Sequence, residues 1–127
     1  MSLTTESQPI YSAADIRRIE QAAGEMSPTL MERAGLAAAE FARELIAEGG
    51  KDVLVLAGPG NNGGDAYEAA LHLKQWFFRV QLVSPADPAK LPRDAQRAHA
   101  KWLAAGGAVL AAPPEDVRWA LVIDGLF

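Results

Sequence analysis

Three short apolar runs divide the chain, and each has the length and composition of a buried strand. They are 52–57 (DVLVLA), 79–84 (RVQLVS) and 120–127 (ALVIDGLF), all rich in Val, Ile or Leu. Continuous runs of this kind are typical of parallel strands that are covered on both faces. A weaker run at 108–111 (AVLA) predicts one further short strand.

Helical periodicity fills the stretches between and before these runs. The longest helix is expected to have Ser27 as its N-cap and Pro28 as its first residue, with apolar side chains at helical spacing until the Gly49–Gly50 pair ends it. The other expected helices are a leading helix between Ser12 and Gly24, one from Asp65 to about Phe77, and one from Arg93 to Ala105.

Strands that alternate with helices build parallel βαβ units, so the pattern predicts an α/β fold. We expect a Rossmann-like three-layer sandwich, in which a mostly parallel sheet has helices on both faces and follows two leading helices. Residues 1–9 are expected to form a disordered or tag-like tail, and 10–127 a single domain. Because no helix follows the last strand, we expect the domain to be truncated after a core strand or to need a partner.

Composition narrows the functional classes. Half of the 127 residues are hydrophobic, and twelve Lys and Arg against sixteen Asp and Glu give a formal net charge of −4. A basic face for nucleic acid is therefore not expected. The absence of cysteine excludes disulfides, thiolate catalysis and Cys-ligated zinc. Because no apolar run reaches about 20 residues and no hydrophobic signal region is present, we expect a cytoplasmic protein without membrane contact.

The densest candidate for chemistry is the glycine-rich sequence LAGPGNNGGDAYEA, which follows the first strand. Gly58, Gly60 and Gly63 have the G-x-G-x-x-G spacing with which dinucleotide-binding folds bring main chain close to a pyrophosphate. A conventional dehydrogenase is disfavoured, because Ser84 stands where its acidic residue is expected and Asp87 is the nearest carboxylate. A Walker-type phosphate loop is excluded, since no Lys-Ser or Lys-Thr follows the last glycine.

Two asparagines and two aspartates add oxygen ligands to this region. Asn61 and Asn62 offer side-chain oxygens and amide donors, and Asp65 is expected at the N-terminus of the following helix. Asp124 ends the last strand, and doubly wound sheets bind ligands at the carboxyl ends of their strands. Such oxygens suit a hard cation rather than zinc. A capped turn at Asp65 and a solvated strand end at Asp124 are the open alternatives.

The sequence VLVLAGPGNNGGDAYEAALHL resembles the signature of the YjeF N-terminal domain family, the NAD(P)H-hydrate epimerases. YSAADIRRIEQAA, SPTLMERAGLAAAE and LVIDGLF resemble three further segments of that family, so the resemblance runs from about Tyr11 to Phe127. It implies a metabolite-repair isomerase that interconverts the R and S epimers of hydrated NADH and NADPH. In bacteria such a domain is often fused to a hydrate dehydratase, which makes the whole protein bifunctional.

The resemblance also implies roles for residues. A potassium ion would bind Asn62 and Asp124. The family's later Gly-Thr-Gly turn and proton-handling aspartate would lie beyond Phe127, so the catalytic residue is unknown and little or no epimerase activity is expected from this chain alone. Family members pair, so a homodimer is expected. The substrate-binding loop would comprise Asn61, Asn62, Gly63, Gly64 and Asp65.

Two observations qualify the resemblance. The family usually has Gly-Asp-Gly where this chain has Gly64-Asp65-Ala66, and because alanine avoids positive φ we expect a slightly shifted loop exit. The rival from a different class is a non-catalytic use of the fold as a dimerising or RNA-associated scaffold, against which the asparagines and aspartates favour the enzyme.

The aromatic run Trp76–Phe78 is interpreted as core or interface rather than as a stacking platform.

Overall fold

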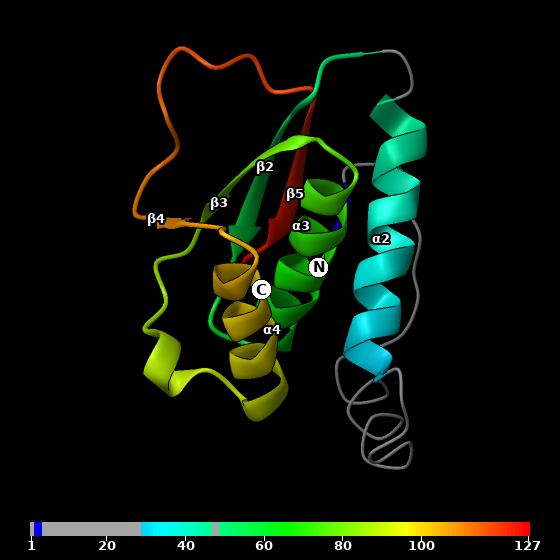
Figure 1. Ribbon diagram of the computed structural model, residues 1–127. Helices are drawn as coiled ribbons and strands as arrows, with labels where there is room; N and C mark the ends of the chain where they lie inside the picture. The colour runs from blue at the N-terminus through cyan, green and yellow to red at the C-terminus, as the bar shows by residue number, and fades with distance from the viewer. Residues whose placement is uncertain (1, 4–28, 47–48) are drawn as a thin grey trace.

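The computed structural model describes residues 2–3, 29–46 and 49–127, in which strands and helices alternate (Figure 1). The α/β class expected from the sequence is confirmed. In chain order the elements are β1 (Ser2–Leu3), α2 (Leu30–Ile46), β2 (Asp52–Ala57), α3 (Asn61–Gln75), β3 (Arg79–Val83), the 3₁₀ helix η1 (Pro88–Lys90), α4 (Arg93–Ala104), β4 (Val109–Leu110) and β5 (Leu121–Gly125).

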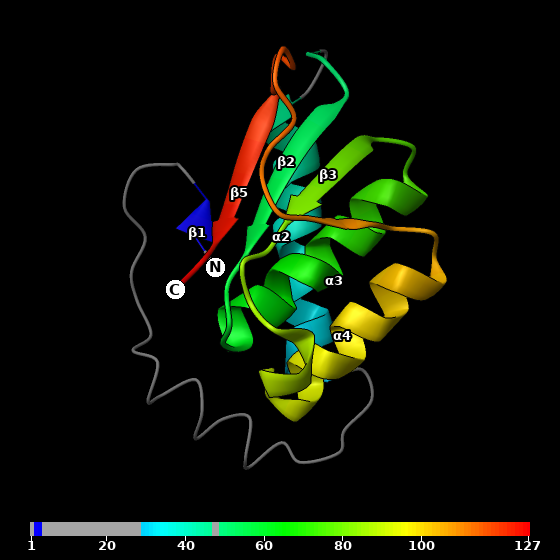
Figure 2. The ribbon, with the colours of Figure 1, turned by 90° about the vertical axis from the view of Figure 1, so that its left-hand side faces the viewer.

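Four parallel strands make up most of the sheet, in the order β5-β2-β3-β4 (Figure 2). On one side β2 pairs with β3, which places Val53 beside Val80, and on the other side it pairs with β5, which places Leu56 beside Asp124. The carboxyl ends of these strands therefore meet at one edge, where α/β folds place their ligand sites.

Ser2 and Leu3 form β1, which runs antiparallel beside β5 and pairs with Asp124 and Ile123. The sequence predicts a disordered or tag-like tail at 1–9, and two residues of that segment are paired with β5 here. Without β1, β5 would be an edge strand with a row of unpaired N–H and C=O groups, which favours such pairing. Residues 4–9 of the expected tail lie outside the described residues.

All three described α-helices lie on the same face of the sheet (Figures 1 and 2). α3 packs against β2, β3 and β5, and α2 and α4 each pack against α3. The sequence predicts helices on both faces, but in the described part only one face carries them. The connection at 111–120, which returns the chain from β4 to β5, is a loop broken by Pro113–Pro114 and supplies no second helical layer. The leading helix expected between Ser12 and Gly24 lies outside the described residues.

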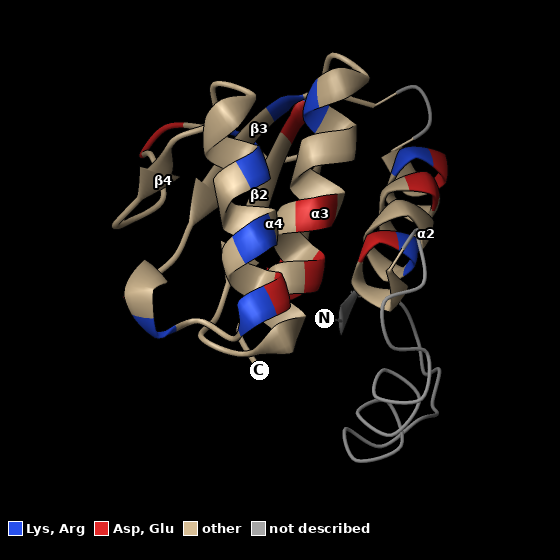
Figure 3. Ribbon diagram, turned by 60° about the horizontal axis from the view of Figure 1, so that its bottom comes forward, with Lys and Arg blue, Asp and Glu red and all other residues tan. Residues whose placement is uncertain are grey.

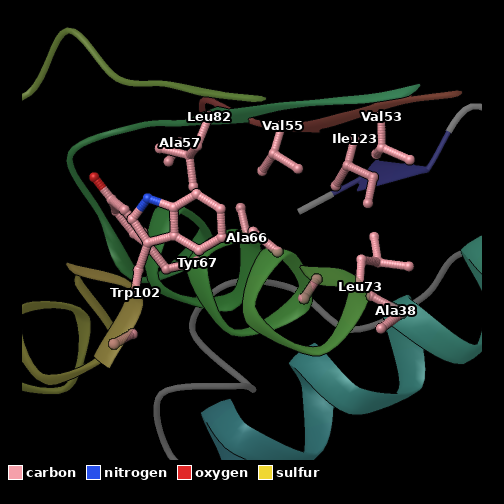
Figure 4. Packing of buried hydrophobic residues seen from close by; sticks show 14 of the residues in the cluster. Ala38, Val53, Val55, Ala57, Ala66, Tyr67, Leu73, Leu82, Trp102 and Ile123 are labelled. Atoms are coloured by element: carbon pink, nitrogen blue, oxygen red, sulfur yellow. The ribbon is translucent and has the colours of Figure 1, made fainter. Parts of the chain in front are cut away.

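The hydrophobic core fills the space between the sheet and the helices (Figure 4). Alternate residues of β2 point toward α3, and Val53, Val55 and Ala57 are fully buried. Tyr67 of α3 and Trp102 of α4 are the largest buried side chains, and the Trp102 indole N–H donates to the Ala108 carbonyl at 3.0 Å. The core thus fixes α3 on β2, directly behind the glycine-rich segment.

A reciprocal pair of hydrogen bonds between Thr29 and Glu32 defines the start of α2. Thr29 Oγ1 accepts from the Glu32 N–H at 3.1 Å, and Glu32 Oε1 accepts from the Thr29 N–H at 3.3 Å. This is a capping box, and the Thr29 carbonyl accepts the first helical bond from Arg33. The N-cap is therefore Thr29 and not Ser27, because only Thr29 lies three residues before a glutamate that can return the bond.

One carboxylate is buried inside the helical layer. The Glu68 side chain of α3 is 4% exposed, and its Oε1 lies 2.5 Å from Nζ of Lys101 on α4. The same ammonium lies 3.8 Å from Oε2 of Glu32 on α2, so one lysine links three helices. In Figure 3 the basic positions of α4 accordingly lie beside the acidic positions of α3.

Candidate functional site

The glycine-rich segment leaves the carboxyl end of β2 and becomes the first turn of α3. Gly60 is the N-cap and Asn61 the first helical residue, so the helix begins four residues before the expected start at Asp65. The N–H groups of Gly63 and Gly64 donate to the Gly60 carbonyl at 3.1 and 3.4 Å, which closes that turn. Glycine has poor helix propensity, so the sequence alone favours a loop here, and tertiary packing overrides that preference.

The glycines of this segment serve close packing rather than unusual backbone angles. Of the described residues, those with positive φ are Phe77, Gly106 and Asp116, and none of them is in the loop. A Cβ at Gly58 would collide with the Leu126 carbonyl, and a Cβ at Gly63 would collide with the Gly58 carbonyl.

Gly60 differs from its neighbours, because a Cβ built there would meet nothing within 4 Å. Gly60 and the preceding Pro59 are both exposed, so they border open space at the N-terminus of α3. The shift expected at the loop exit concerns Ala66 and stays a prediction. Ala66 lies inside α3, where alanine is favourable, and its Cβ packs against Gly125.

Asn61 and Asn62 occupy the first two positions of α3 and are half-buried. The Asn62 side-chain amide donates to the main-chain carbonyl of Phe127, which holds the segment after β5 against the helix N-terminus. The main-chain N–H groups of Asn61 and Asn62 donate to no main-chain carbonyl within 29–46 and 49–127. Since the N-terminus of a helix carries partial positive charge, this first turn can receive an anion.

Asp124 lies at the same end of the sheet, half-buried and in register with Leu56 of β2. Its Oδ1 accepts from the Leu126 N–H at 3.0 Å. Ile123 belongs to the core under the helices, so strand alternation turns the Asp124 side chain toward the opposite face. Asp65, predicted at the helix start, is instead the fifth residue of α3 and is half-buried.

The carboxyl end of β3 lacks the acidic residue of a conventional dehydrogenase. Ser84 is buried there, and its Oγ accepts from the Ala86 N–H at 3.2 Å and bonds to the Tyr67 hydroxyl. Burial raises the pKa of Tyr67, so this hydroxyl is neutral and structural. Asp87 accepts from the Ala89 N–H at 3.0 Å and caps η1. Both side chains therefore have structural partners.

The structure thus brings the predicted residues together at one edge. Gly58 donates its N–H to the Gly125 carbonyl at 2.9 Å, and Asn62 reaches Phe127. The part of the chain that is described holds no cluster of three His, Cys, Asp or Glu side chains for a metal ion. The roles of Gly125 and Phe127 were missed in the sequence, although a glycine inside a strand is a signal for close approach of another backbone.

A parallel sheet whose glycine-rich turn leads into a helix N-terminus defines an α/β domain of the Rossmann-like class. The family model described as YjeF-related protein N-terminus matches residues 27–127. The chain therefore belongs to this family. Within 2–3, 29–46 and 49–127, the helices are all too short or too polar to span a bilayer.

Relatives with curated names agree with this family. The chain is 52% identical over 118 residues to an NAD(P)H-hydrate epimerase of Bordetella pertussis, an alignment that covers 93% of this chain and 51% of that protein. It is 44% identical over 119 residues to the one of Achromobacter xylosoxidans, with 94% and 57% covered. It is 38% identical over 128 residues to a bifunctional NAD(P)H-hydrate repair enzyme of Leishmania braziliensis, with 92% and 22% covered.

A solved structure shares the fold. The crystal structure of yeast ynu0 superposes with a TM-score of 0.67 at 24% identity, over 88% of this chain and 53% of the yeast chain. At this identity the likeness concerns the fold alone. The present chain spans about half the length of the Bordetella pertussis relative and of the yeast protein.

Proposed function

We propose that this chain is the dinucleotide-binding part of an NAD(P)H-hydrate epimerase, which interconverts the R and S epimers at the hydrated carbon of damaged NADH and NADPH. The observation that carries the proposal is 52% identity to the Bordetella pertussis epimerase across 93% of this chain. The family match over 27–127 includes the complete glycine-rich turn and the end of β5. The cytoplasmic location and the homodimer expected from the sequence stay predictions.

In this proposal the first turn of α3 binds the pyrophosphate. The N–H groups of Gly63 and Gly64 donate to the Gly60 carbonyl, so the N–H groups of Asn61 and Asn62 are the donors for the anion. Gly63 and Gly64 contribute by their small size. Gly63 lets α3 begin close to Gly58, and Gly64 lets it pack against Met31 of α2 and Ala95 of α4. Asp65, one turn further along α3, completes the substrate-binding set expected from the sequence.

We also propose that Asn62 and Asp124 hold a potassium ion at the carboxyl edge of the sheet. The ion would lie at the end of β5, between Asn62 on the helical side and the Asp124 carboxylate, which turns toward the other face, and the chemistry of both side chains fits it. The bond to Phe127 uses the Asn62 amide nitrogen and leaves its Oδ1 as the ligand. A carboxylate has several lone-pair sites, so the bond from Leu126 still allows Asp124 to contact a cation. When bound, the ion would supply positive charge beside the phosphates, and both donors are the oxygen type that hard cations prefer.

Binding and turnover are tested separately on the 127-residue chain. We expect calorimetry to detect binding of hydrated NADH. Asn61→Ala keeps the main-chain N–H but removes the side-chain amide of the expected substrate-binding set, so it should weaken binding about tenfold. Gln75→Ala, at the exposed opposite end of the same helix, is the matched control. Absence of binding, or an equal loss of affinity in Asn61→Ala and Gln75→Ala, would overturn the proposal. Either result would favour the non-catalytic scaffold.

The turnover assay starts from one purified epimer and follows the other by chromatography. We expect little or no interconversion by this chain, because no residue of it is assigned to proton transfer. A rate equal to that of the Bordetella pertussis relative would contradict the expectation that this chain lacks the residue for proton transfer. It would leave the proposed dinucleotide-binding role intact.

The potassium proposal has a readout that does not need activity. At equal ionic strength, the melting temperature in KCl should exceed that in NaCl by about 3–5 °C, the shift expected when the ion is present at roughly ten times its Kd. Asp124→Asn should abolish the difference. Equal melting temperatures of the unsubstituted chain in the two salts would refute the site.

A further inference from the structure

The turn between α3 and β3 holds a residue in a conformation that normally belongs to glycine. Phe77 has φ of 69°, in the left-handed region. Its N–H donates to the Lys74 carbonyl at 3.0 Å, and the Phe78 N–H donates to the Leu73 carbonyl at 3.1 Å. This pair of bonds is a Schellman motif with Phe77 at the C′ position, where glycine is the usual residue because a Cβ is strained there.

Burial does not compensate for this strain. The Phe77 side chain is 88% exposed, whereas Phe78, the next residue, is 9% exposed and packs in the core with Leu73. The hydrophobic contact that accompanies a Schellman motif is thus already made by Phe78. Phe77 could be glycine without loss to the fold, and residues that break local rules without a gain in stability concentrate at functional sites.

Cations lie on the rings of both sequence neighbours of Phe77. The guanidinium carbon Cζ of Arg43 on α2 lies 4.0 Å from the centroid of the Trp76 ring. The Nζ atom of Lys51 lies 4.6 Å from the centroid of the Phe78 ring. Arg79, two residues after Phe77, has a side chain that is 65% exposed and is paired with Asp52. Both aromatic neighbours of Phe77 therefore carry a cation, in a chain whose net charge is −4.

We propose that Phe77, Arg43, Lys51 and Arg79, named here the Phe77 patch, form a docking site for an acidic protein segment with an apolar pocket for the phenyl ring. The patch lies at the end of the molecule where α2 and α3 end and β2 begins (Figure 1), opposite the glycine-rich turn. Aromatic and arginine side chains are enriched in protein-binding interfaces. Complementary charge selects an acidic partner.

Charge and size argue against other occupants. A second copy related by a two-fold axis would place the same cations against each other, which costs energy. A lipid surface needs an extended apolar face, whereas this patch offers one exposed ring. Three cations on an acidic chain are too few for a nucleic-acid site.

The test uses a phage-displayed random peptide library selected on the folded 127-residue chain. We expect enrichment of peptides that contain Asp and Glu around aliphatic or aromatic residues. Measured by fluorescence anisotropy, a synthesised peptide should bind Phe77→Gly at least tenfold more weakly and Lys51→Glu several-fold more weakly, with affinity falling as salt rises. Leu103→Ala, which removes another exposed apolar side chain, on α4, should leave binding unchanged.

The Phe77→Gly variant also shows whether a loss of peptide affinity comes from loss of folding. Glycine relieves the strain at the C′ position, so Phe77→Gly should raise the melting temperature by about 3–5 °C while it lowers peptide affinity. The proposal is overturned if no peptide is enriched or if Phe77→Gly binds as well as the unsubstituted chain. It is also overturned if Phe77 is instead needed for self-association in light scattering or for binding to phosphatidylserine vesicles. Binding of hydrated NADH should be the same in both proteins.

Discussion

The side-chain amide of Asn62 donates a hydrogen bond to the main-chain carbonyl of Phe127, 65 residues further along the chain. The bond joins the first turn of α3 to the segment that follows β5. It also fixes the orientation of Asn62, because the amide nitrogen faces the protein and the side-chain oxygen is left for another ligand. The side-chain nitrogen of Asn62 therefore has a structural role, and its side-chain oxygen can bind a ligand.

Asn62→Ala should lower the free energy of unfolding by about 0.5–1.5 kcal/mol, the usual net contribution of one hydrogen bond. Asn61→Ala is the matched control, since the Asn61 side chain holds no corresponding segment in the described part of the chain, and its effect should stay below about 0.5 kcal/mol. Urea denaturation of both variants measures the difference. Equal effects would mean that the bond to Phe127 contributes nothing to stability.

Close approach of main chain, rather than backbone angle, explains Gly58 and Gly63. Gly58→Ala and Gly63→Ala each bring a Cβ against a main-chain carbonyl, and backbone yields less readily than a side chain. We expect each to destabilise the fold by about 2–3 kcal/mol or more. Gly60→Ala, which faces open space, should stay within about 0.5 kcal/mol. Melting temperatures that fall equally for all three variants would refute this distinction.

The capping box of α2 should make stability depend on pH. The hydrogen bond from the Thr29 N–H is the main cause that lowers the pKa of Glu32 below its ordinary value of 4.5. A carboxyl whose pKa is depressed by folding stabilises the fold above its unfolded pKa, and this contribution is lost as pH falls through the folded value.

Urea titrations at pH 7 and near pH 3 test this dependence. Glu32→Gln should be less stable than the unsubstituted chain at pH 7, and the gap should narrow near pH 3. Thr29→Ala should cost about 1 kcal/mol at pH 7. A gap for Glu32→Gln that is the same at both pH values would show that the carboxylate is not stabilised by folding.

The strands were predictable because their signal is local. The run 52–57 contains β-branched and leucine residues without interruption, and β2 has the expected bounds. The start of α3 was not predictable, because Gly63 and Gly64 oppose helix locally and only the packing of Gly63 on Gly58 makes a helical turn favourable there. The placement of the described helices on one face could not be predicted either, because the path of the loop at 111–120 depends on the whole sheet.

The site was predictable in its location and less so in its detail. The order of strands and the spacing of glycines place Asn61, Asn62 and Asp124 at one edge, as expected. The partner of Asn62 is 65 residues away, and no local pattern identifies it. The cap at Thr29, by contrast, was available in the sequence as Thr-x-x-Glu. Pro28 suggested Ser27 instead, because proline is common at the first position of a helix.

The pair formed by Glu68 and Lys101 gives the last prediction. The Glu68 carboxylate is almost fully buried, whereas the Lys101 side chain is 36% exposed, so the pair is partly screened by solvent. Lys101→Met leaves a buried carboxylate without its cation, and we expect a loss of about 1–3 kcal/mol. Glu68→Gln removes the charge and keeps the shape, so its cost should be smaller.

The double variant separates charge pairing from packing. Once Glu68 is Gln, the Lys101→Met substitution no longer strands a charge, so the double variant should be more stable than Lys101→Met alone. Urea denaturation at pH 7 of the two single variants and the double variant gives the coupling energy. If the two substitutions are additive, the 2.5 Å contact carries no electrostatic coupling, and Lys101 acts only through the packing of its aliphatic stem.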